Sequence, residues 1–421
     1  MTNRLSIFFI VGLSVVSTFL YATEIEDEEE SAATAKRSSI VDAAPAGTVD
    51  ENTNDEQAVA NQQPLTLLNS SVEPGSFNTL HWSSEQSFAS IATPVPVLIA
   101  HGAQSGPVLC MTAAVHGDEL NGIEMVRRLM YDLEPATLRG TVIGVPIVNI
   151  DGFRRGERYL SDRRDLNRHF PGSADGSAAA RIAYNFFTNV VTHCDYLVDL
   201  HTGSMARSNL PQIRGNLKKP EIVELAKHLG GITVLHDTGA AGTLRRAATD
   251  SGIPSLTMEA GGPHVLEEGA VDYGVKALET LLDNLGMRKS SRFWSAPQPV
   301  FYESEWIRAG QGGILLSQVK LGDKVKEGQV LGTVVDPVSN TGSAILASFN
   351  GRILGIALNQ VVMTGYAAYH VGVEKAAEKV EQEAEQSDDV STQKTPTSES
   401  DSATDTIVKP LSDPNASDDA E

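Results

Sequence analysis

Polar residues follow four apolar, strand-like segments of this 421-residue chain. The four polar stretches are His116-Gly117-Asp118-Glu119, Asn149-Ile150-Asp151-Gly152, His201-Thr202-Gly203 and Glu259-Ala260-Gly261-Gly262. In an open α/β sheet, ligands bind in the crevice beyond the carboxyl ends of the strands. Polar residues at four such ends could therefore meet at one site.

Two histidines and a glutamate have the types and spacing of metal ligands. His116 and Glu119 are three residues apart where a strand gives way to a helix. If the helix begins near Asp118, both side chains can point the same way. His201, at another strand end, is the third candidate. Two nitrogens and one carboxylate, with a fourth position open, form the ligand set of catalytic zinc. The sequence predicts one Zn2+ per chain.

A long polar segment from Arg158 to Gly172 could supply substrate-binding groups. It is too polar for a strand, and its Gly and Pro residues do not suit an ordinary helix. An ordered loop of this length is usually functional. Its arginines could hold a carboxylate through two parallel hydrogen bonds, which lysine does less well. The alternative is a surface loop with solvated charges.

Strand-like and helix-like patterns alternate through the middle of the chain. Strands are expected at 108–115, 141–148, 196–200, 232–235 and 253–258, and helices at 120–133, 177–193, 220–229 and 265–285. Ser177 is the expected N-cap of the second helix. This alternation predicts an α/β sheet with helices on both faces.

Residues 298–374 form a separate, small, all-β domain in this interpretation, because short strands punctuated by Gly replace the helices. Its pattern is similar to the biotinyl/lipoyl barrel-sandwich. A carrier domain of that kind needs a lysine on the hairpin between its halves, and the hairpin from Asp336 to Gly342 has none. We expect a structural or lid-like role.

The net charge of -21 belongs mainly to the two tails. Residues 24–60 hold eleven acidic residues against two basic ones, and residues 375–421 hold thirteen against four. Segments 23–60 and 375–421 contain few large apolar side chains, so we expect them to be disordered. A basic surface for nucleic acid is missing, which excludes DNA or RNA binding as the main role. Two cysteines cannot build a disulfide-dense scaffold.

Residues 1–22 resemble a secretory signal, with Arg4 before an uncharged, mostly apolar run that ends at Ala22. The alternative is an uncleaved membrane anchor. We therefore expect an exported protein, periplasmic or extracellular, tethered to a membrane only if residues 5–22 stay attached. The catalytic domain is expected at 61–290.

The polar motifs together resemble the succinylglutamate desuccinylase/aspartoacylase family, a branch of the zinc carboxypeptidase-like hydrolases. They are His116 to Glu119, Arg164-Asp165-Leu166-Asn167-Arg168-His169-Phe170-Pro171-Gly172, Asp199 to Gly203, and Glu259-Ala260-Gly261. The resemblance covers about 65–374. It implies a zinc-carboxypeptidase-like mixed sheet flanked by helices, followed by the barrel-sandwich-like β domain.

The resemblance also implies roles for individual residues. It implies that the metal ligands are His116, Glu119 and His201, and that Glu259 is the general base and then the acid. It implies that a substrate carboxylate is held by Asn167 and Arg168, and that the Asp165 carboxylate orients His116. The arginine that polarises the scissile carbonyl is Arg158, with Arg163 or Arg164 as alternatives.

The sequence thus predicts a zinc-dependent hydrolase that cleaves the amide bond of an N-acyl amino acid or small peptide with a free carboxylate. Two alternatives stay open. The first is an exported metallocarboxypeptidase or amidase that acts on cell-wall peptides. The second is a metal-binding scaffold with a retired active site, which turnover of any amide would exclude.

Overall fold

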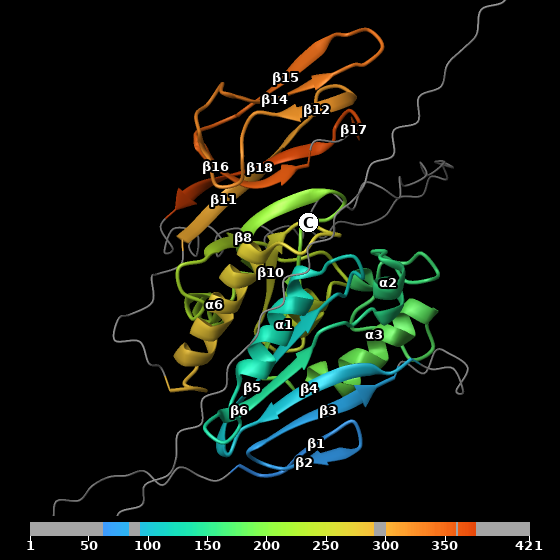
Figure 1. Cartoon of the computed structure of the whole chain (residues 1–421), viewed down its shortest axis with the longest axis vertical. Helices are drawn as coiled ribbons and strands as arrows, with labels where there is room; N and C mark the ends of the chain where they lie inside the picture. Colours follow the sequence, from blue (N-terminus) through green and yellow to red (C-terminus); the bar gives the residue numbers. More distant parts are fainter. Residues whose placement is uncertain (1–61, 84–92, 290–299, 359–360, 376–421) are drawn as a thin grey trace, which may run out of the picture. The chain divides into compact units, whose positions relative to one another are not determined.

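The structure, a computed structural model, describes residues 62–83, 93–289, 300–358 and 361–375 (Figure 1). The predicted leader 1–22 and linker 23–60 lie outside these residues, as does the acidic tail apart from Lys375, which ends the last strand. Among the described residues, no helix combines the length and apolar character needed to cross a bilayer.

A mixed sheet of twelve strands runs through the described part of the chain. Its strands, in spatial order, are β13 (Lys324–Val325), β16 (Gly351–Ala357), β18 (Ala367–Lys375), β11 (Val300–Arg308), β9 (Thr233–His236), β8 (Arg207–Gly215), β10 (Ser255–Gly261), β7 (Tyr196–His201), β5 (Gln104–Ala113), β6 (Arg139–Val145), β4 (Val95–His101) and β3 (Ser76–Trp82). The neighbours β10, β7, β5 and β6 are parallel. Their carboxyl ends therefore share one edge.

Helices cover both faces of the sheet, as the alternating pattern predicts. One apolar core packs α1 (Asn121–Asp132), α4 (Pro220–Lys227) and α6 (Glu268–Asn284) against it. A second core packs α3 (Ala178–Asn189) and α5 (Leu244–Asp250) against the other face. Leu109 lies in the first core and Cys110 in the second, because neighbouring strand residues point to opposite faces. Ser177 caps α3, since its hydroxyl accepts from the Ala180 N–H.

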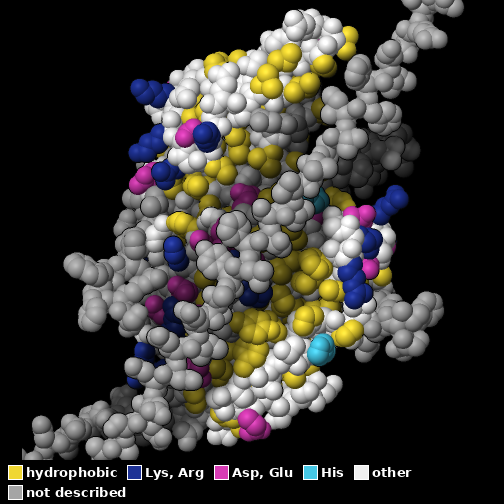
Figure 2. Space-filling view, viewed as in Figure 1, with side chains coloured by type: hydrophobic (Ala, Val, Ile, Leu, Met, Phe, Trp, Pro, Cys, Tyr) yellow, Lys and Arg dark blue, Asp and Glu magenta, His cyan; other side chains and the backbone are white. Residues whose placement is uncertain are grey.

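The C-terminal β region adds a second sheet with its own core. Its strands are β15 (Gly342–Leu346), β14 (Val330–Val335), β12 (Gly313–Ser317) and β17 (Val361–Val362). On the face drawn in Figure 2, apolar side chains gather over this upper part of the molecule. The turn between β14 and β15 is closed by Asp336, whose carboxylate accepts from the Val338 N–H and the Ser339 hydroxyl.

Strand β8 joins the two parts of the fold. It pairs with β9 and β10, and it also pairs with β16 of the C-terminal region. The pairings of β16 with β18, β18 with β11 and β11 with β9 complete a ring of five strands, which we call the strand ring. Leu235, Tyr302 and Leu354 are buried together in a small apolar cluster on three of its strands.

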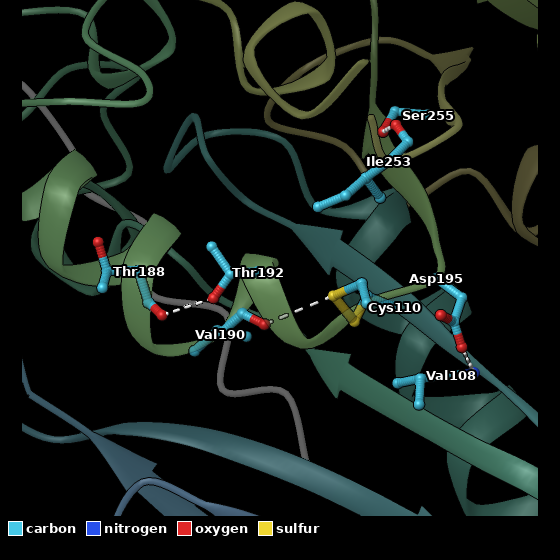
Figure 3. Close-up of a disulfide and its surroundings, with 9 residues drawn as sticks. Val108, Cys110, Thr188, Val190, Thr192, Asp195, Ile253 and Ser255 are labelled. Carbon is cyan, nitrogen blue, oxygen red and sulfur yellow. Dashed lines mark hydrogen bonds between the residues drawn. A yellow bond between two sulfur atoms is a disulfide. The ribbon is translucent and has the colours of Figure 1, made fainter. Parts of the chain in front are cut away.

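A disulfide between Cys110 and Cys194 ties β5 to the segment that precedes β7 (Figure 3). The Val108 N–H also donates to the Asp195 carboxylate, at 2.7 Å. The Asp195 N–H donates in turn to the Val108 carbonyl, so the disulfide and two hydrogen bonds hold β5 to the segment that leads into β7.

Several elements differ from those expected from the sequence. The expected helix at 120–133 begins at Asn121, and the helix at 177–193 ends at Asn189, before the short 3-10 turn Val191–His193. Further elements were not expected at all, among them helix α5. The others include β8, α2 (Ile150–Arg155) and the four amino-terminal strands, of which β1 (Leu65–Leu67) and β2 (Ser70–Val72) form a hairpin before β3 and β4.

Candidate metal centre and active site

The three predicted metal ligands meet at one point beyond the carboxyl ends of β5 and β7. The Nδ1 atom of His116 lies 2.8 Å from Oε1 of Glu119, and Nδ1 of His201 lies 2.8 Å from Oε2 of the same carboxylate. The two Nδ1 atoms are 3.2 Å apart. All three side chains are buried, and their ligand atoms lie within 4.8 Å of one another.

The turn that carries His116 and Glu119 precedes α1, so these side chains are not placed by a helical turn as the sequence suggested. Gly117 explains how the turn is held. A Cβ atom at this residue would overlap the backbone of Gly152 and Phe153 in α2. The Gly117 N–H also donates to the Arg158 carbonyl. This close approach fixes the turn beside the loop that begins at Arg158.

Carboxylates hold the outer nitrogens of both histidines. Nε2 of His116 lies 3.1 Å from Asp165, and Nε2 of His201 lies 2.8 Å from Asp199. Burial disfavours a charge on His201, yet Asp199 and Glu119 raise the pKa of His201 well above its ordinary value. Histidines that bind metals commonly donate their other ring N–H to a carboxylate in this way.

The electrostatics of the cluster favour a positive charge at its centre. Burial and then the charge of Arg158 lower the pKa of His116, but Glu119 and Asp165 outweigh them and raise it to about 8. Burial opposes ionisation of Glu119, yet the two histidines hold its pKa far below the ordinary value. Two imidazole nitrogens and a carboxylate around one buried point fit a zinc ion by the chemistry of the donors.

Of the three arginines considered for the scissile carbonyl, Arg158 lies in the site. Its Nη1 donates to Glu119 at 3.2 Å, and its Nη2 donates to Asp165 at 3.1 Å. Arg163 and Arg164 are exposed, and Arg164 pairs with a carboxylate in its own loop. The role of Arg158 at a substrate carbonyl stays a prediction.

Glu259 lies in the same pocket as the three metal-ligand candidates. It is paired in register with His201, since β10 and β7 are parallel neighbours. Its Oε2 accepts from Nδ2 of Asn209 at 3.1 Å, and its Oε1 lies 3.9 Å from Nη1 of Arg214. The carboxylate is therefore held from β8 while it faces the site.

Of the two predicted carboxylate-binding residues, Asn167 and Arg168, only one lines the pocket. Asp165 caps the short 3-10 turn Leu166–Arg168 by accepting from the Asn167 N–H. Asn167 is buried, and its Oδ1 accepts from the Leu244 N–H at 2.8 Å, so its amide nitrogen is the group left to donate toward a ligand. Asn167 lines the pocket, whereas Arg168 does not and instead donates to the Asn167 carbonyl.

Sequence reasoning missed several polar residues in and around the site. Asp199 could have been found, because it lies two residues before His201 and thus on the same face of the strand. Thr112 donates to its other oxygen at 2.6 Å. No sequence pattern pointed to Asn209 or Arg214, because their strand, β8, was not predicted.

The mixed sheet with helices on both faces thus carries a buried His-Glu-His group that could hold a metal ion. Residues 105–285 match the family model described as succinylglutamate desuccinylase/aspartoacylase catalytic domain. This match agrees with the resemblance that the motifs predict.

Two curated relatives and one solved structure illustrate the match. The chain is 27% identical over 267 residues to the N-alpha-acetyl-L-2,4-diaminobutyric acid deacetylase of Halomonas elongata, covering 60% of this chain and 77% of that protein. It is 33% identical over 135 residues to a succinylglutamate desuccinylase of Pseudomonas aeruginosa, covering 29% of this chain and 37% of that protein. A succinylglutamate desuccinylase/aspartoacylase from Rhodobacter sphaeroides has the same fold, with a TM-score of 0.63, 21% identity, and coverage of 71% and 96% of the two chains.

Proposed function

We propose that this chain is a zinc-dependent deacylase that hydrolyses the amide bond of an N-acyl amino acid with a free carboxylate. The observation that carries the proposal is the meeting of His116, Glu119 and His201 with Glu259 in one buried pocket. The named activities of the two curated relatives, a deacetylase and a desuccinylase, support the same class of reaction.

The three ligands would hold the metal, with Asp165 and Asp199 orienting the imidazoles. A zinc ion bound there supplies a Lewis acid, which polarises a carbonyl and makes a water easier to deprotonate.

The protein's own groups perform the proton transfers in this proposal. The Glu259 carboxylate accepts a proton from the water that attacks the amide carbon, and it then gives that proton to the departing amine nitrogen. Asn209 keeps the carboxylate in place during both transfers. The Arg158 guanidinium stabilises the negative charge that develops on the carbonyl oxygen. The Asn167 amide nitrogen binds the free carboxylate, with Arg168 beside it.

We also propose that the protein is exported. The disulfide between Cys110 and Cys194 supports this, because such bonds persist in oxidising compartments and are rare in the cytosol. The apolar run at 5–22, which lies outside the described residues, is the sequence feature behind the same proposal. Export also keeps the second candidate open, an amidase or carboxypeptidase for cell-wall peptides.

A substrate panel tests both candidates. The full chain is loaded with zinc and incubated with N-acyl amino acids and with cell-wall peptides, and the products are identified by mass spectrometry. We expect release of a free amino acid from at least one N-acyl amino acid, and no release by Glu259→Gln. Cleavage of the peptides alone would favour the second candidate, and cleavage of no amide would refute both.

A further inference from the structure

A second cavity adjoins the active site at one end of the strand ring. It has a volume of about 190 Å3. Residues of β8, β9, β11 and β18 line it, among them Arg214, Ser304, Trp306 and His370. Arg214 and Asp237 line both this cavity and the metal pocket, so the two spaces are neighbours. A cavity of about 150 Å3 can hold a benzene ring, so this one has room for a short acyl or side-chain group.

Arg214 reaches this cavity with an incomplete set of partners. Arg214 is only 5% exposed, and its Nε and Nη2 atoms are buried without a hydrogen-bond partner. Those two atoms form one edge of the guanidinium, which can bind both oxygens of a carboxylate. Arg127 uses the same edge to hold Glu124, with both distances at 2.7 Å. Burying two charged donors unpaired is costly, so a ligand that pairs them would bind favourably.

The other charged and polar groups nearby do not take that edge. The Asp237 carboxylate is held by Arg245 at 2.9 Å and by the Gly239 N–H at 2.7 Å. His370 bonds through Nε2 to the Ser304 hydroxyl at 2.8 Å. Burial, helped by the charge of Arg214, lowers the pKa of His370 to about 3, so it is neutral at physiological pH.

We propose that this cavity is a second carboxylate subsite, in which Arg214 binds a carboxylate on the acyl group or the side chain of the substrate. The inference rests on the proposed deacylase function and adds a specificity-determining residue to it. The subsite joins β8 to β11 and β18, so the C-terminal β region takes part in substrate choice.

Binding at this subsite should be visible at Trp306. The Nε and Nη2 atoms of Arg214 have almost no exposed surface, so a carboxylate reaches them only when the side chains that line the cavity shift. The Trp306 ring stacks on His370, with centroids 4.6 Å apart and planes within 7°. Tryptophan fluorescence therefore reports entry of a ligand, and Trp306→Phe identifies which tryptophan gives the change.

Pairs of substrates that differ by one group test the proposal in the full, zinc-loaded chain. N-succinylalanine is compared with the analogue in which the succinyl carboxylate is an amide. N-acetylglutamate is compared with N-acetylglutamine. Wild type should prefer the carboxylate member of one pair, and Arg214→Met should lower that preference about 10- to 100-fold. The first pair responds if the acyl group enters the cavity, and the second if the side chain does. Arg214→Lys, which keeps the charge without the two-pronged edge, should lie between.

Arg127→Gln is the matched control, since its edge is already occupied on the surface of α1, and it should keep the wild-type preference. The ratio within a pair removes any general effect of Arg214 on the nearby Glu259.

A binding measurement separates this inference from the proposed function. Succinate and its monoamide are titrated into wild type and Arg214→Met while Trp306 fluorescence is followed. Succinate binding that Arg214→Met weakens at least 10-fold supports the subsite, even if no amide is cleaved. Active wild type that uses both members of each pair equally, or succinate and monoamide binding equally well to wild type and variant, would overturn the subsite and leave the deacylase proposal intact.

Discussion

Glu259 lies opposite His201 across the pairing of parallel strands β10 and β7. The proposed proton carrier and a proposed metal ligand therefore leave the sheet at the same level, on neighbouring strands. Because the register of the two strands sets this relationship, the two groups meet without a long connecting loop. This rigid placement suits a site in which a carboxylate must reach a water close to a metal.

Glu259→Gln should separate chemistry from binding. Glutamine keeps the shape of the side chain but cannot accept the proton, so kcat should fall by about 10²–10⁴-fold while substrate affinity changes little. Steady-state kinetics on the best substrate, with metal content measured in parallel, gives both values. Glu268→Gln, a change at an exposed acid on α6, should behave as wild type. Near-normal kcat in the first variant would refute the mechanism.

Metal analysis should find one zinc per chain after reconstitution. His201→Ala removes one of three ligands and should lower zinc content and affinity strongly. His193→Ala, at an exposed histidine outside the site, should retain the full complement. A His201→Ala protein with unchanged zinc would show that the metal lies elsewhere.

Asn167→Asp tests the proposed carboxylate contact. The aspartate can still accept from the Leu244 N–H, so the local fold should survive. Its charge would repel a substrate carboxylate, and KM should rise by about 10-fold or more with a smaller change in kcat. Arg168→Lys, farther from the pocket, should have a weaker effect. If wild type hydrolyses a substrate amidated at that carboxylate as efficiently as the free acid, the proposed contact with Asn167 is refuted.

The disulfide should add to the stability of the fold. Cys110 and Cys194 are 84 residues apart, and closing a loop of this length restricts the unfolded chain, which is worth about 2–5 kcal/mol. We expect the double variant Cys110→Ser/Cys194→Ser to unfold at a lower urea concentration than wild type. Its deacylase activity under native conditions should be retained. Thiol titration of denatured, unreduced wild type should find no free thiol, and two free thiols would show that the bond does not form.

His370 should make stability depend on pH. Its pKa is about 3 in the folded protein, lowered by burial and by Arg214, against an ordinary value of 6.5. Between these values the unfolded chain binds a proton here and the folded chain does not, so the free energy of unfolding falls as the pH drops below 6.5. One such group contributes up to about 1.4 kcal/mol per pH unit.

His370→Gln should therefore lose stability less steeply between pH 6.5 and 4, measured by urea unfolding at several pH values. The other charged groups near His370 are Arg214 and Asp237, and both stay in the variant. An unchanged slope would mean that the folded protein can protonate His370.

The parts of the fold that the sequence predicts are those with a regular apolar pattern. Strands β7 and β10 and the second half of β5 are buried on both faces, so they appear as largely apolar runs whose polar ends are easy to see. This is why His116, His201 and Glu259 could be named and also brought together in advance.

Strand β8 shows where that reasoning fails. It contains Pro211, and its buried residues include Arg207, Asn209, Gln212 and Arg214, because one of its faces lines the polar site instead of an apolar core. No apolar pattern of period two can appear in such a strand. The pairing of two cysteines 84 residues apart, and the choice among three arginines of one loop, likewise depend on contacts that sequence spacing does not contain.

The strand ring has a consequence for how the protein loses its structure. Because β9 and β8 each hydrogen-bond to a strand of the C-terminal region, removing residues 300–375 would expose unpaired backbone edges beside Arg214. We therefore expect the two parts to unfold together, and calorimetry should record a single cooperative transition.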